Sequence, residues 1–222
     1  MRNVLIILFI ALCTLFTAGC GTESEGSQGK TEDPAPLLPT SGNYSFRRYI
    51  EEKGHTDYRV LYSQVPDSDI VEVKTIVDLE AAQSSSDISE TSNFYEETKD
   101  GIYGYIVLSE EFPSEWDAED IKKFPKTKII AYPLETSKTW SEKIKDFDLE
   151  ITYHIREVNA EIKTPAKTFN DCIIIDFEEK DKDGNTLRKG NSAFAPNVGW
   201  IRHEVEEEVL KDVHKLIKIN ER

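Results

Sequence analysis

Hydrophobic and polar residues alternate with a period of two along most of the chain after residue 44. The alternation is clearest in four segments, 58–62, 71–79, 149–155 and 169–177. A period of two is typical of antiparallel strands that bury one face and expose the other. The pattern therefore predicts a mainly β fold, an antiparallel meander that forms a curved sheet or a half-open barrel.

Turn-forming residues separate these alternating segments. They are Lys53-Gly54, Pro66-Asp67, Asp100-Gly101, Asp183-Gly184-Asn185 and Pro196-Asn197. Such pairs favour the backbone angles of tight hairpin turns. Between Ile155 and Val158 the alternation slips by one residue. Because a slip of one residue exchanges the two faces of a strand, we expect a bulge or sharp bend near Arg156-Glu157.

Three segments depart from the alternation. Residues 114–124 lie between two prolines and place Trp116, Ile121 and Phe124 roughly on one helical face. This predicts a short inserted helix with Ser114 as its N-cap, either packed on the sheet or serving as a lid. Residues 205–219 have apolar residues at helical spacing and predict a C-terminal helix, with a last strand as the alternative. Residues 81–93 are rich in Ser and are expected to form a mobile loop.

The N-terminus has the features of an export signal. Arg2 is followed by an uncharged, apolar run from Val4 to Ala18. A membrane-spanning helix needs about 20 apolar residues, so this run has instead the length of a signal-peptide core. The run ends in Thr17-Ala18-Gly19-Cys20.

This ending resembles the lipobox of bacterial lipoproteins, in which small residues precede a cysteine, although Thr17 stands where that family more often has Leu. The resemblance implies that Cys20 receives a diacylglyceryl group and becomes the first residue after cleavage of the Gly19–Cys20 bond. An ordinary secretory signal followed by a chance cysteine is the alternative. Two acyl chains suffice for stable anchoring. We therefore expect a protein held at the bacterial membrane by its lipid, on the extracytoplasmic side.

The chain then divides into three expected parts. Residues 1–19 form the lipoprotein signal peptide. Residues 20–43 carry the lipidated Cys20 and a flexible linker, because they lack aromatic residues and are rich in Gly, Ser, Glu, Thr and Pro. Residues 44–222 form a single antiparallel β domain, a length that suits one hydrophobic core.

The last third of the chain resembles a loosely defined set of uncharacterised bacterial lipoproteins. Their C-terminal sheet carries a T-P-A-G-T-F stretch and a closing Y-A-P-G-V-G-L-V turn. The matching residues here are Thr164-Pro165-Ala166-Lys167-Thr168-Phe169 and Phe194-Ala195-Pro196-Asn197-Val198-Gly199-Trp200-Ile201. The resemblance implies an exported antiparallel sheet. It implies no activity, because the motifs contain only turn and packing residues.

Charge and cysteine content narrow the function classes. The chain has 42 acidic and 27 basic residues, a formal charge of −15. A nucleic-acid-binding protein needs a basic surface, so we expect no nucleic acid among the partners. Of the three cysteines, Cys13 belongs to the signal and Cys20 to the lipid. Cys172 remains, among apolar neighbours, and we expect a buried, unreactive thiol there.

The candidate residues for chemistry are few. His203-Glu204 begins like a zinc-protease motif, but the second histidine is missing. His154 and His203 could meet across neighbouring strands, while His55 and His214 carry no motif. The segment from Asp181 to Asn185 lacks the later ligands of a calcium loop and is better interpreted as a hairpin turn. We therefore expect no metal, no cofactor and no catalytic residue.

Two functions follow from these features. The first is a non-catalytic, membrane-anchored lipoprotein, monomeric, with a binding or scaffold role toward an unknown protein of the cell envelope. The second is a carrier that holds a lipid or another apolar ligand in a half-open barrel. The inner face of the sheet distinguishes them, since an aromatic-lined hollow favours the carrier and a filled core the scaffold. An envelope hydrolase is the least supported alternative.

Overall fold

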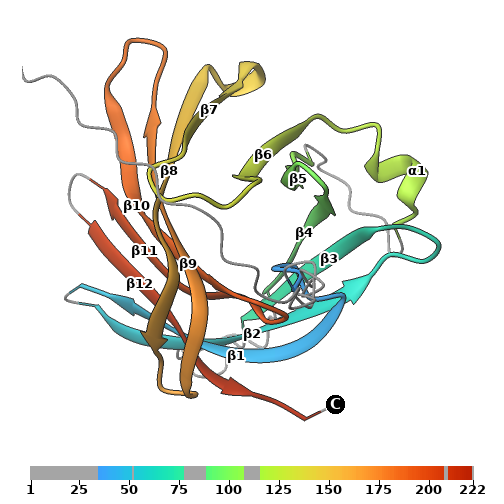
Figure 1. The fold of residues 1–222 in the computed structure, drawn as a ribbon, viewed down its shortest axis with the longest axis vertical. Coiled ribbons are helices and arrows are strands. Elements are labelled where there is room, and N and C mark those ends of the chain that lie inside the picture. The colour runs from blue at the N-terminus through green and yellow to red at the C-terminus, as the bar shows by residue number, and fades with distance from the viewer. Residues whose placement is uncertain (1–34, 52, 78–88, 108–115, 208–209, 222) are drawn as a thin grey trace, which may run out of the picture. The chain divides into compact units, whose positions relative to one another are not determined.

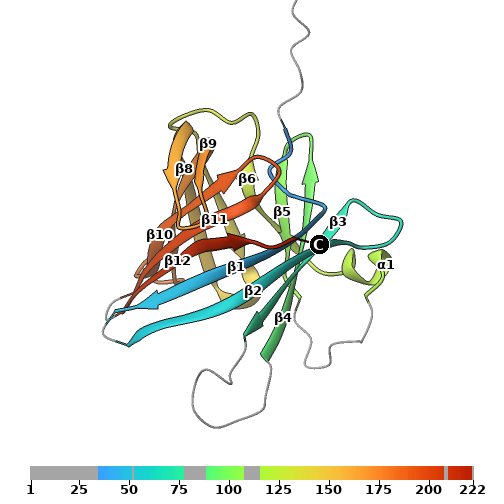
Figure 2. The same ribbon diagram turned by 90° about the horizontal axis from the view of Figure 1, so that it is seen from below.

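The fold is a single antiparallel sheet of twelve strands. The computed structural model describes residues 35–51, 53–77, 89–107, 116–207 and 210–221. The strands follow one another across the sheet in the order β6-β5-β4-β3-β2-β1-β12-β11-β10-β9-β8-β7. Figures 1 and 2 show how this sheet curls around a central axis. The expected mainly β meander is confirmed.

The first six strands form one half of the sheet and the last six the other. The first half comprises β1 (Ser41–Ile50), β2 (Gly54–Gln64), β3 (Ile70–Val77), β4 (Ser89–Thr98), β5 (Gly101–Tyr105) and β6 (Lys126–Ala131). The second half comprises β7 (Thr139–Ile144), β8 (Leu149–Lys163), β9 (Thr168–Lys180), β10 (Thr186–Ala195), β11 (Gly199–Glu207) and β12 (Leu210–Ile219). The two halves join where β1 pairs with β12.

The barrel stays half-open at its seam, where the edge strands β6 and β7 face each other. No backbone ladder joins these two strands in the described part of the chain. Side chains bridge them instead: Trp140 Nε1 on β7 donates a hydrogen bond to the carbonyl oxygen of Lys128 on β6, at 2.9 Å. In Figure 1 the two ribbons stand apart at this seam.

All five expected turns connect neighbouring strands of the sheet. Several of their residues have a positive φ, which Gly, Asn and Asp tolerate best. Gly184 in the β9–β10 turn has a φ of 84°, and Asn197 in the β10–β11 turn has a φ of 59°. The prediction of tight turns at these residues is therefore confirmed.

The expected bulge in β8 is also confirmed. The register between β8 and β9 shifts between Ile155 and Glu157 and again before Ala160 and Ile162. Bulges increase the local bend of a strand. The far end of the long β8–β9 hairpin reaches β12, where the backbone N–H of Ala166 donates to the carbonyl of Leu216 at 3.4 Å.

The inserted helix exists but is shorter than expected. Helix α1 spans Ala118–Ile121, with Asp117 as its N-cap. The expected cap Ser114 lies outside the described residues. Ile121 is fully buried in a cluster with Ile70, Phe94 and Trp116, so the helix packs on β3 and β4 as a helix on a sheet. A single 3₁₀ turn, Lys145–Phe147, follows β7.

The expected C-terminal helix over 205–219 is wrong. Residues 199–207 and 210–219 form the strands β11 and β12. The helical spacing misled because the residues of β12 that share the inner face are Asp212, His214 and Leu216. Two of these three residues are polar, so the alternation of apolar and polar residues that marks a strand is not visible in this part of the sequence.

Two expected boundaries also change. The linker expected over 20–43 does not extend to 43: β1 begins at Ser41, and Leu37 is buried at 2 % exposure because it packs against the sheet. The mobile loop expected over 81–93 ends earlier, since β4 begins at Ser89 and pairs with β3. Residues 1–34, with the expected signal peptide, and residues 81–88 lie outside the described residues.

Helices are almost absent from this fold. Within the described ranges, none is long and apolar enough to cross a membrane.

Candidate functional site

The concave face of the sheet encloses a hollow of about 580 Å³. Every strand except β7 contributes side chains to its lining, because period-two alternation turns every second residue inward. Aromatic rings form much of the wall: Tyr58, Tyr62, Tyr95, Tyr153, Phe177, Phe194 and Trp200. The hollow is thus a mostly apolar, aromatic-lined space of the size that small-molecule sites have, about 300–1,000 Å³.

The N-terminal segment of the described chain also lines this hollow. Leu37 and Leu38 both line it. Their backbone N–H groups donate to the two carboxylate oxygens of Glu97 on β4, at 3.2 and 2.8 Å. Tyr132 donates to the same carboxylate. On the other side, the backbone N–H of Asn197 donates to the carbonyl of Pro36 at 2.8 Å. Residues 36–38 therefore connect β4 to the β10–β11 turn.

A smaller cavity of about 330 Å³ adjoins the hollow and is polar. The two spaces share five lining residues: Arg48, Arg188, Trp200, His203 and His214. Arg48 on β1 donates through Nε to Asp212 Oδ2 on β12 at 2.7 Å. Arg188 on β10 donates through Nε to Glu179 Oε2 on β9, also at 2.7 Å. The hollow thus has an apolar body and one polar end with two ion pairs.

Polar residues cross the floor of the hollow in one row of cross-strand partners. Ser192, His203, His214 and Arg48 are successive partners in the ladders of β10, β11, β12 and β1. Directly opposed residues on neighbouring strands point to the same face. The two imidazole rings therefore lie side by side, with their centroids 6.0 Å apart.

Burial keeps these histidines neutral. It lowers the pKa of His203 to about 4, an effect to which electrostatic repulsion from the His214 ring and from Arg188 adds. Burial also lowers the pKa of His214, although the carboxylate of Asp212 opposes this. An imidazole that stays neutral at pH 7 offers one donor and one acceptor nitrogen.

The partners of the rings determine which nitrogen of His214 carries its proton. Burial raises the pKa of the Tyr58 hydroxyl far above its usual value, so Tyr58 keeps its proton and donates it to His214 Nδ1 at 2.7 Å. The proton of His214 then belongs on Nε2, which lies 3.3 Å from Asp212 Oδ1. Tyr58, His214, Asp212 and Arg48 thus lie in contact one after another, although Asp212 Oδ1 itself has no hydrogen-bond partner among the described residues.

A serine lies against the other histidine. Ser192 Oγ is 2.8 Å from His203 Nδ1. A serine nucleophile requires a base with a pKa near the working pH and a third group that orients the base. The pKa of His203 is too low for an efficient base, and among the described residues no carboxylate is hydrogen-bonded to its Nε2. The pair is best explained as a satisfied polar contact.

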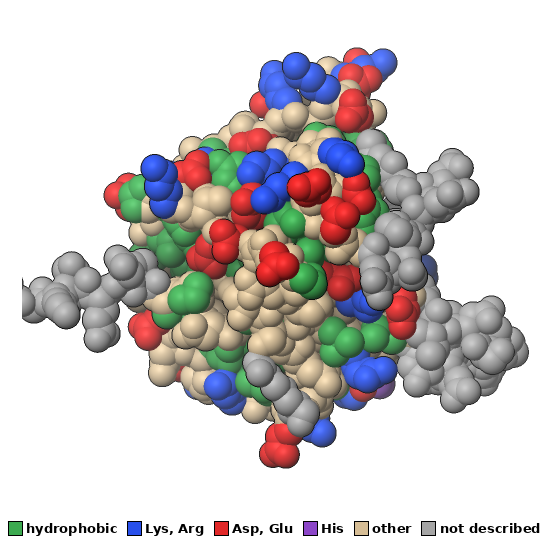
Figure 3. Space-filling model, turned by 90° about the vertical axis from the view of Figure 1, so that its right-hand side faces the viewer, with side chains coloured by type: hydrophobic (Ala, Val, Ile, Leu, Met, Phe, Trp, Pro, Cys, Tyr) green, Lys and Arg blue, Asp and Glu red, His purple; other side chains and the backbone are tan. Residues whose placement is uncertain are grey.

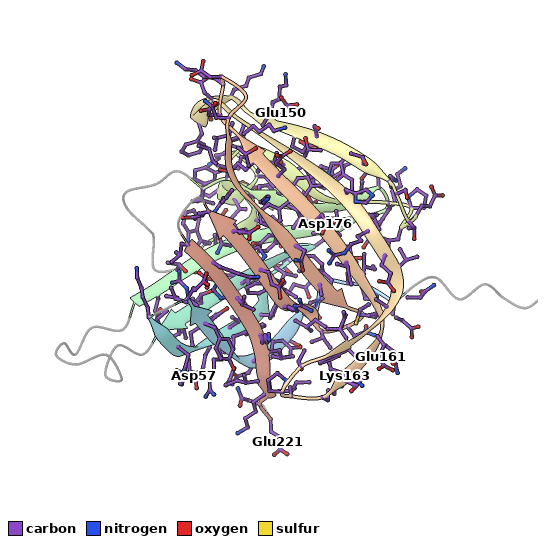
Figure 4. The ribbon with its side chains drawn as sticks, turned by 90° about the vertical axis from the view of Figure 1, so that its left-hand side faces the viewer. Asp57, Glu150, Glu161, Lys163, Asp176 and Glu221 are labelled. Carbon is purple, nitrogen blue, oxygen red and sulfur yellow. The ribbon has the colours of Figure 1, made fainter. Side chains whose placement is uncertain are left out.

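The expected meeting of His154 and His203 does not occur. His154 belongs to the row with Asp176 and Asn191, one register position away from the row of His203. Adjacent positions on a strand point to opposite faces, so His154 lies on the outer face, 3.6 Å from Asp176 Oδ2. Figure 4 shows Asp176 on that outer surface. His55 is exposed and contacts the ring of Tyr49.

The remaining candidate residues keep structural roles. Cys172 is free and fully buried, as expected, and burial raises the pKa of its thiol to about 11. Asp181 accepts hydrogen bonds from the backbone N–H groups of Asp183 and Asn185, which makes a hairpin turn. The described residues contain no group of three or more side chains that could hold a metal ion. Cys20 lies outside them.

Sequence reasoning missed Arg48, Arg188, Asp212 and Tyr58. One signal was present in the sequence. In Tyr44-x-Phe46-x-Arg48 and in Asp212-x-His214-x-Leu216, a charged residue stands two or four positions from buried apolar residues and therefore points to the same inner face of its strand. Charges elsewhere on the surface carry no such signal. Figure 3 shows acidic and basic side chains interspersed on one outer face, which is typical of a solvated surface.

Comparison with known proteins gives a fold and no family. No known protein family matches the sequence, and no curated protein matches it. The crystal structure of a candidate lipoprotein from Parabacteroides distasonis is similar, with a TM-score of 0.53 and 16 % identity over 85 % of this chain and all of that chain.

A candidate exported protein with a YmcC-like fold from Bacteroides fragilis is less similar. It has a TM-score of 0.44 and 15 % identity over 85 % of this chain and 99 % of that one. At these identities the likeness to the Parabacteroides protein establishes a shared fold. The resemblance of residues 139–204 to uncharacterised lipoproteins stays a prediction.

Proposed function

We propose that this protein is a lipid-anchored, extracytoplasmic lipoprotein that binds an apolar ligand in the hollow of its half-open barrel and catalyses no reaction on it. The observation that carries the proposal is the hollow itself. A sheet that served only as a scaffold would fill its concave face with side chains, since protein interiors pack without large voids. Here about 580 Å³ remains open behind an aromatic wall.

The location rests on separate observations. The signal-like segment ends at Cys20, with small residues before it. A candidate lipoprotein from Parabacteroides distasonis shares the fold. Both support an exported protein whose sheet is tethered to the membrane by the lipid on Cys20.

Native mass spectrometry tests the ligand. Every contact described above lies within residues 35–221, so the chain from Gly21 onward retains the whole sheet. After purification from bacterial cells, or after incubation with 1-monolaurin, we expect a bound apolar species that organic extraction removes. A protein that carries no ligand and takes up none would contradict the carrier proposal.

A matched pair of variants places the ligand. Thr75 on β3 lines the hollow, and its neighbour Lys74 is turned to the other face. Thr75→Trp fills part of the hollow and is expected to abolish uptake, whereas Lys74→Trp is expected to leave it unchanged. Equal uptake by the two variants would place the ligand elsewhere.

Anchoring needs its own test. In cells that express the full chain, Cys20→Ala is expected to abolish the incorporation of labelled palmitate and the cleavage before residue 20. If the variant were processed as before and its mature form remained membrane-bound, the lipoprotein proposal would be wrong.

A further inference from the structure

Two buried carboxylates mark the polar end of the hollow. Glu179 and Asp212 are 6 % and 8 % exposed, and they are the buried charged residues of the described chain. Each lies on a different strand, and each accepts hydrogen bonds from an arginine of a neighbouring strand. Both arginines line the large hollow and the small polar cavity.

Buried carboxylates are costly, because desolvation of an ion pair consumes most of its attraction. Replacing a buried ion pair by well-packed apolar residues is often neutral or stabilising, so stability alone does not account for these carboxylates. What the carboxylates provide is a fixed position for two guanidinium groups. The side chains of Arg48 and Arg188 are 42 % and 49 % exposed, so they remain accessible from the cavities while their partners are covered.

Each guanidinium keeps donors free. Arg188 contacts Glu179 through Nε, and its two Nη groups have no partner among the residues that the structure describes. Arg48 directs Nε and Nη2 at Asp212, which leaves Nη1 without a partner in the same set. A guanidinium has five N–H donors in a rigid plane, a geometry that matches the oxygens of a carboxylate or a phosphate.

We propose that the hollow takes an amphiphile with an acidic head group, a carboxylate or a phosphate monoester, which binds the free N–H groups of Arg48 and Arg188. This inference rests on the proposed function and specifies its ligand class. The acyl chain lies along the aromatic wall of the large hollow. The head group lies where the two cavities meet, beside Trp200, which lines both.

Other head groups fit this end less well. An ammonium group would face two guanidinium groups, and the one carboxylate oxygen there without a hydrogen bond, Asp212 Oδ1, is buried and lies 3.3 Å from His214 Nε2. An uncharged hydroxyl head group would leave most of the free N–H donors unpaired. Glu207 also lines the small cavity, but it is exposed and stays in contact with water.

Four ligands with the same twelve-carbon chain test the proposal: laurate, dodecyl phosphate, 1-monolaurin and dodecylamine. Their affinities for the chain from Gly21 onward are measured by isothermal titration calorimetry, below their micelle concentrations. We expect at least one acid to bind about tenfold more tightly than 1-monolaurin and dodecylamine. The tighter of the two acids identifies the head group.

The variants locate the effect. Arg188→Gln is expected to weaken binding of the preferred acid about tenfold and to leave 1-monolaurin unchanged. Arg48→Gln leaves Asp212 buried without its partner, so the double variant Arg48→Gln/Asp212→Asn removes both charges together. Arg47→Gln is the matched control, because Arg47 points to the outer face and pairs with Asp57.

The outcomes separate the two proposals. If none of the four ligands binds, the proposed function itself fails. If 1-monolaurin or dodecylamine binds as tightly as both acids, or if the arginine variants behave as Arg47→Gln does, the apolar carrier stands and the acidic head group is refuted.

Discussion

We expect the free energy of unfolding to decrease at acidic pH because His203 is buried in its neutral form. Burial lowers the pKa of its ring to about 4, whereas an imidazole in the unfolded chain has a pKa of about 6.5. Between these two values the unfolded chain binds a proton that the folded protein does not. Stability must therefore fall as the pH falls from above 6.5 toward 4.

The two pKa values set the size of the effect. Linkage gives a loss of about 2 kcal/mol between pH 7.5 and pH 5 from this one group. In the variant His203→Gln this contribution disappears, while the amide can still form a hydrogen bond with Ser192. The free energy of unfolding of the variant should therefore depend less on pH than that of the wild type.

Urea unfolding at a series of pH values, followed by circular dichroism, measures the difference. His154→Gln is the control, because the His154 side chain is 42 % exposed on the outer face and contacts water in both states. The reasoning is refuted if the wild type and His203→Gln lose the same stability between pH 7.5 and pH 5, or if His154→Gln removes the dependence equally well.

Three further predictions concern the core, the N-terminal segment and the thiol. Phe46 is fully buried and stacks on its neighbours, so Phe46→Ala should cost about 3–5 kcal/mol in urea unfolding, against less than about 0.5 kcal/mol for the half-exposed Phe147→Ala. Glu97→Gln removes the charge that holds the N–H of Leu38, and hydrogen exchange of that amide should become about tenfold faster; an unchanged rate would contradict the role of Glu97. In the chain from Gly21 onward, Cys172 is the only cysteine and should react with maleimide in denaturant but not in the native state; rapid native labelling would disprove its burial.

The alternating segments predicted strands because these strands bury one apolar face. Turn residues such as Gly184 and Asn197 act locally, through φ angles that other residues avoid, so their positions could be read without the fold. The same holds for the bulge beyond Ile155, where the phase of the hydrophobic pattern itself changes. Such features need only neighbouring residues to be recognised.

Strand β12 was misread for a reason connected with the candidate site. Its inner face carries Asp212 and His214 before Leu216, so the inward period contains polar residues, while Val213 and Ile217 fall on the other face. Apolar residues on both sides of a short segment imitate the spacing of a helix. Local rules of sequence fail most often where residues are selected for a site rather than for packing.

The polar end of the hollow was beyond sequence reasoning because it is assembled across the whole chain. Arg48 and Asp212 are separated by 164 positions and meet only because β1 pairs with β12. That pairing brings together the two halves of the sheet, so the step that completes the curved wall also brings Arg48 to the row of His203 and His214. Arg188 needs no such closure, since it reaches Glu179 within the β9–β10 hairpin. The proposed ligand site is therefore complete only when β1 pairs with β12, and a variant that weakens the β1–β12 ladder should lose ligand binding before it loses the β9–β10 hairpin.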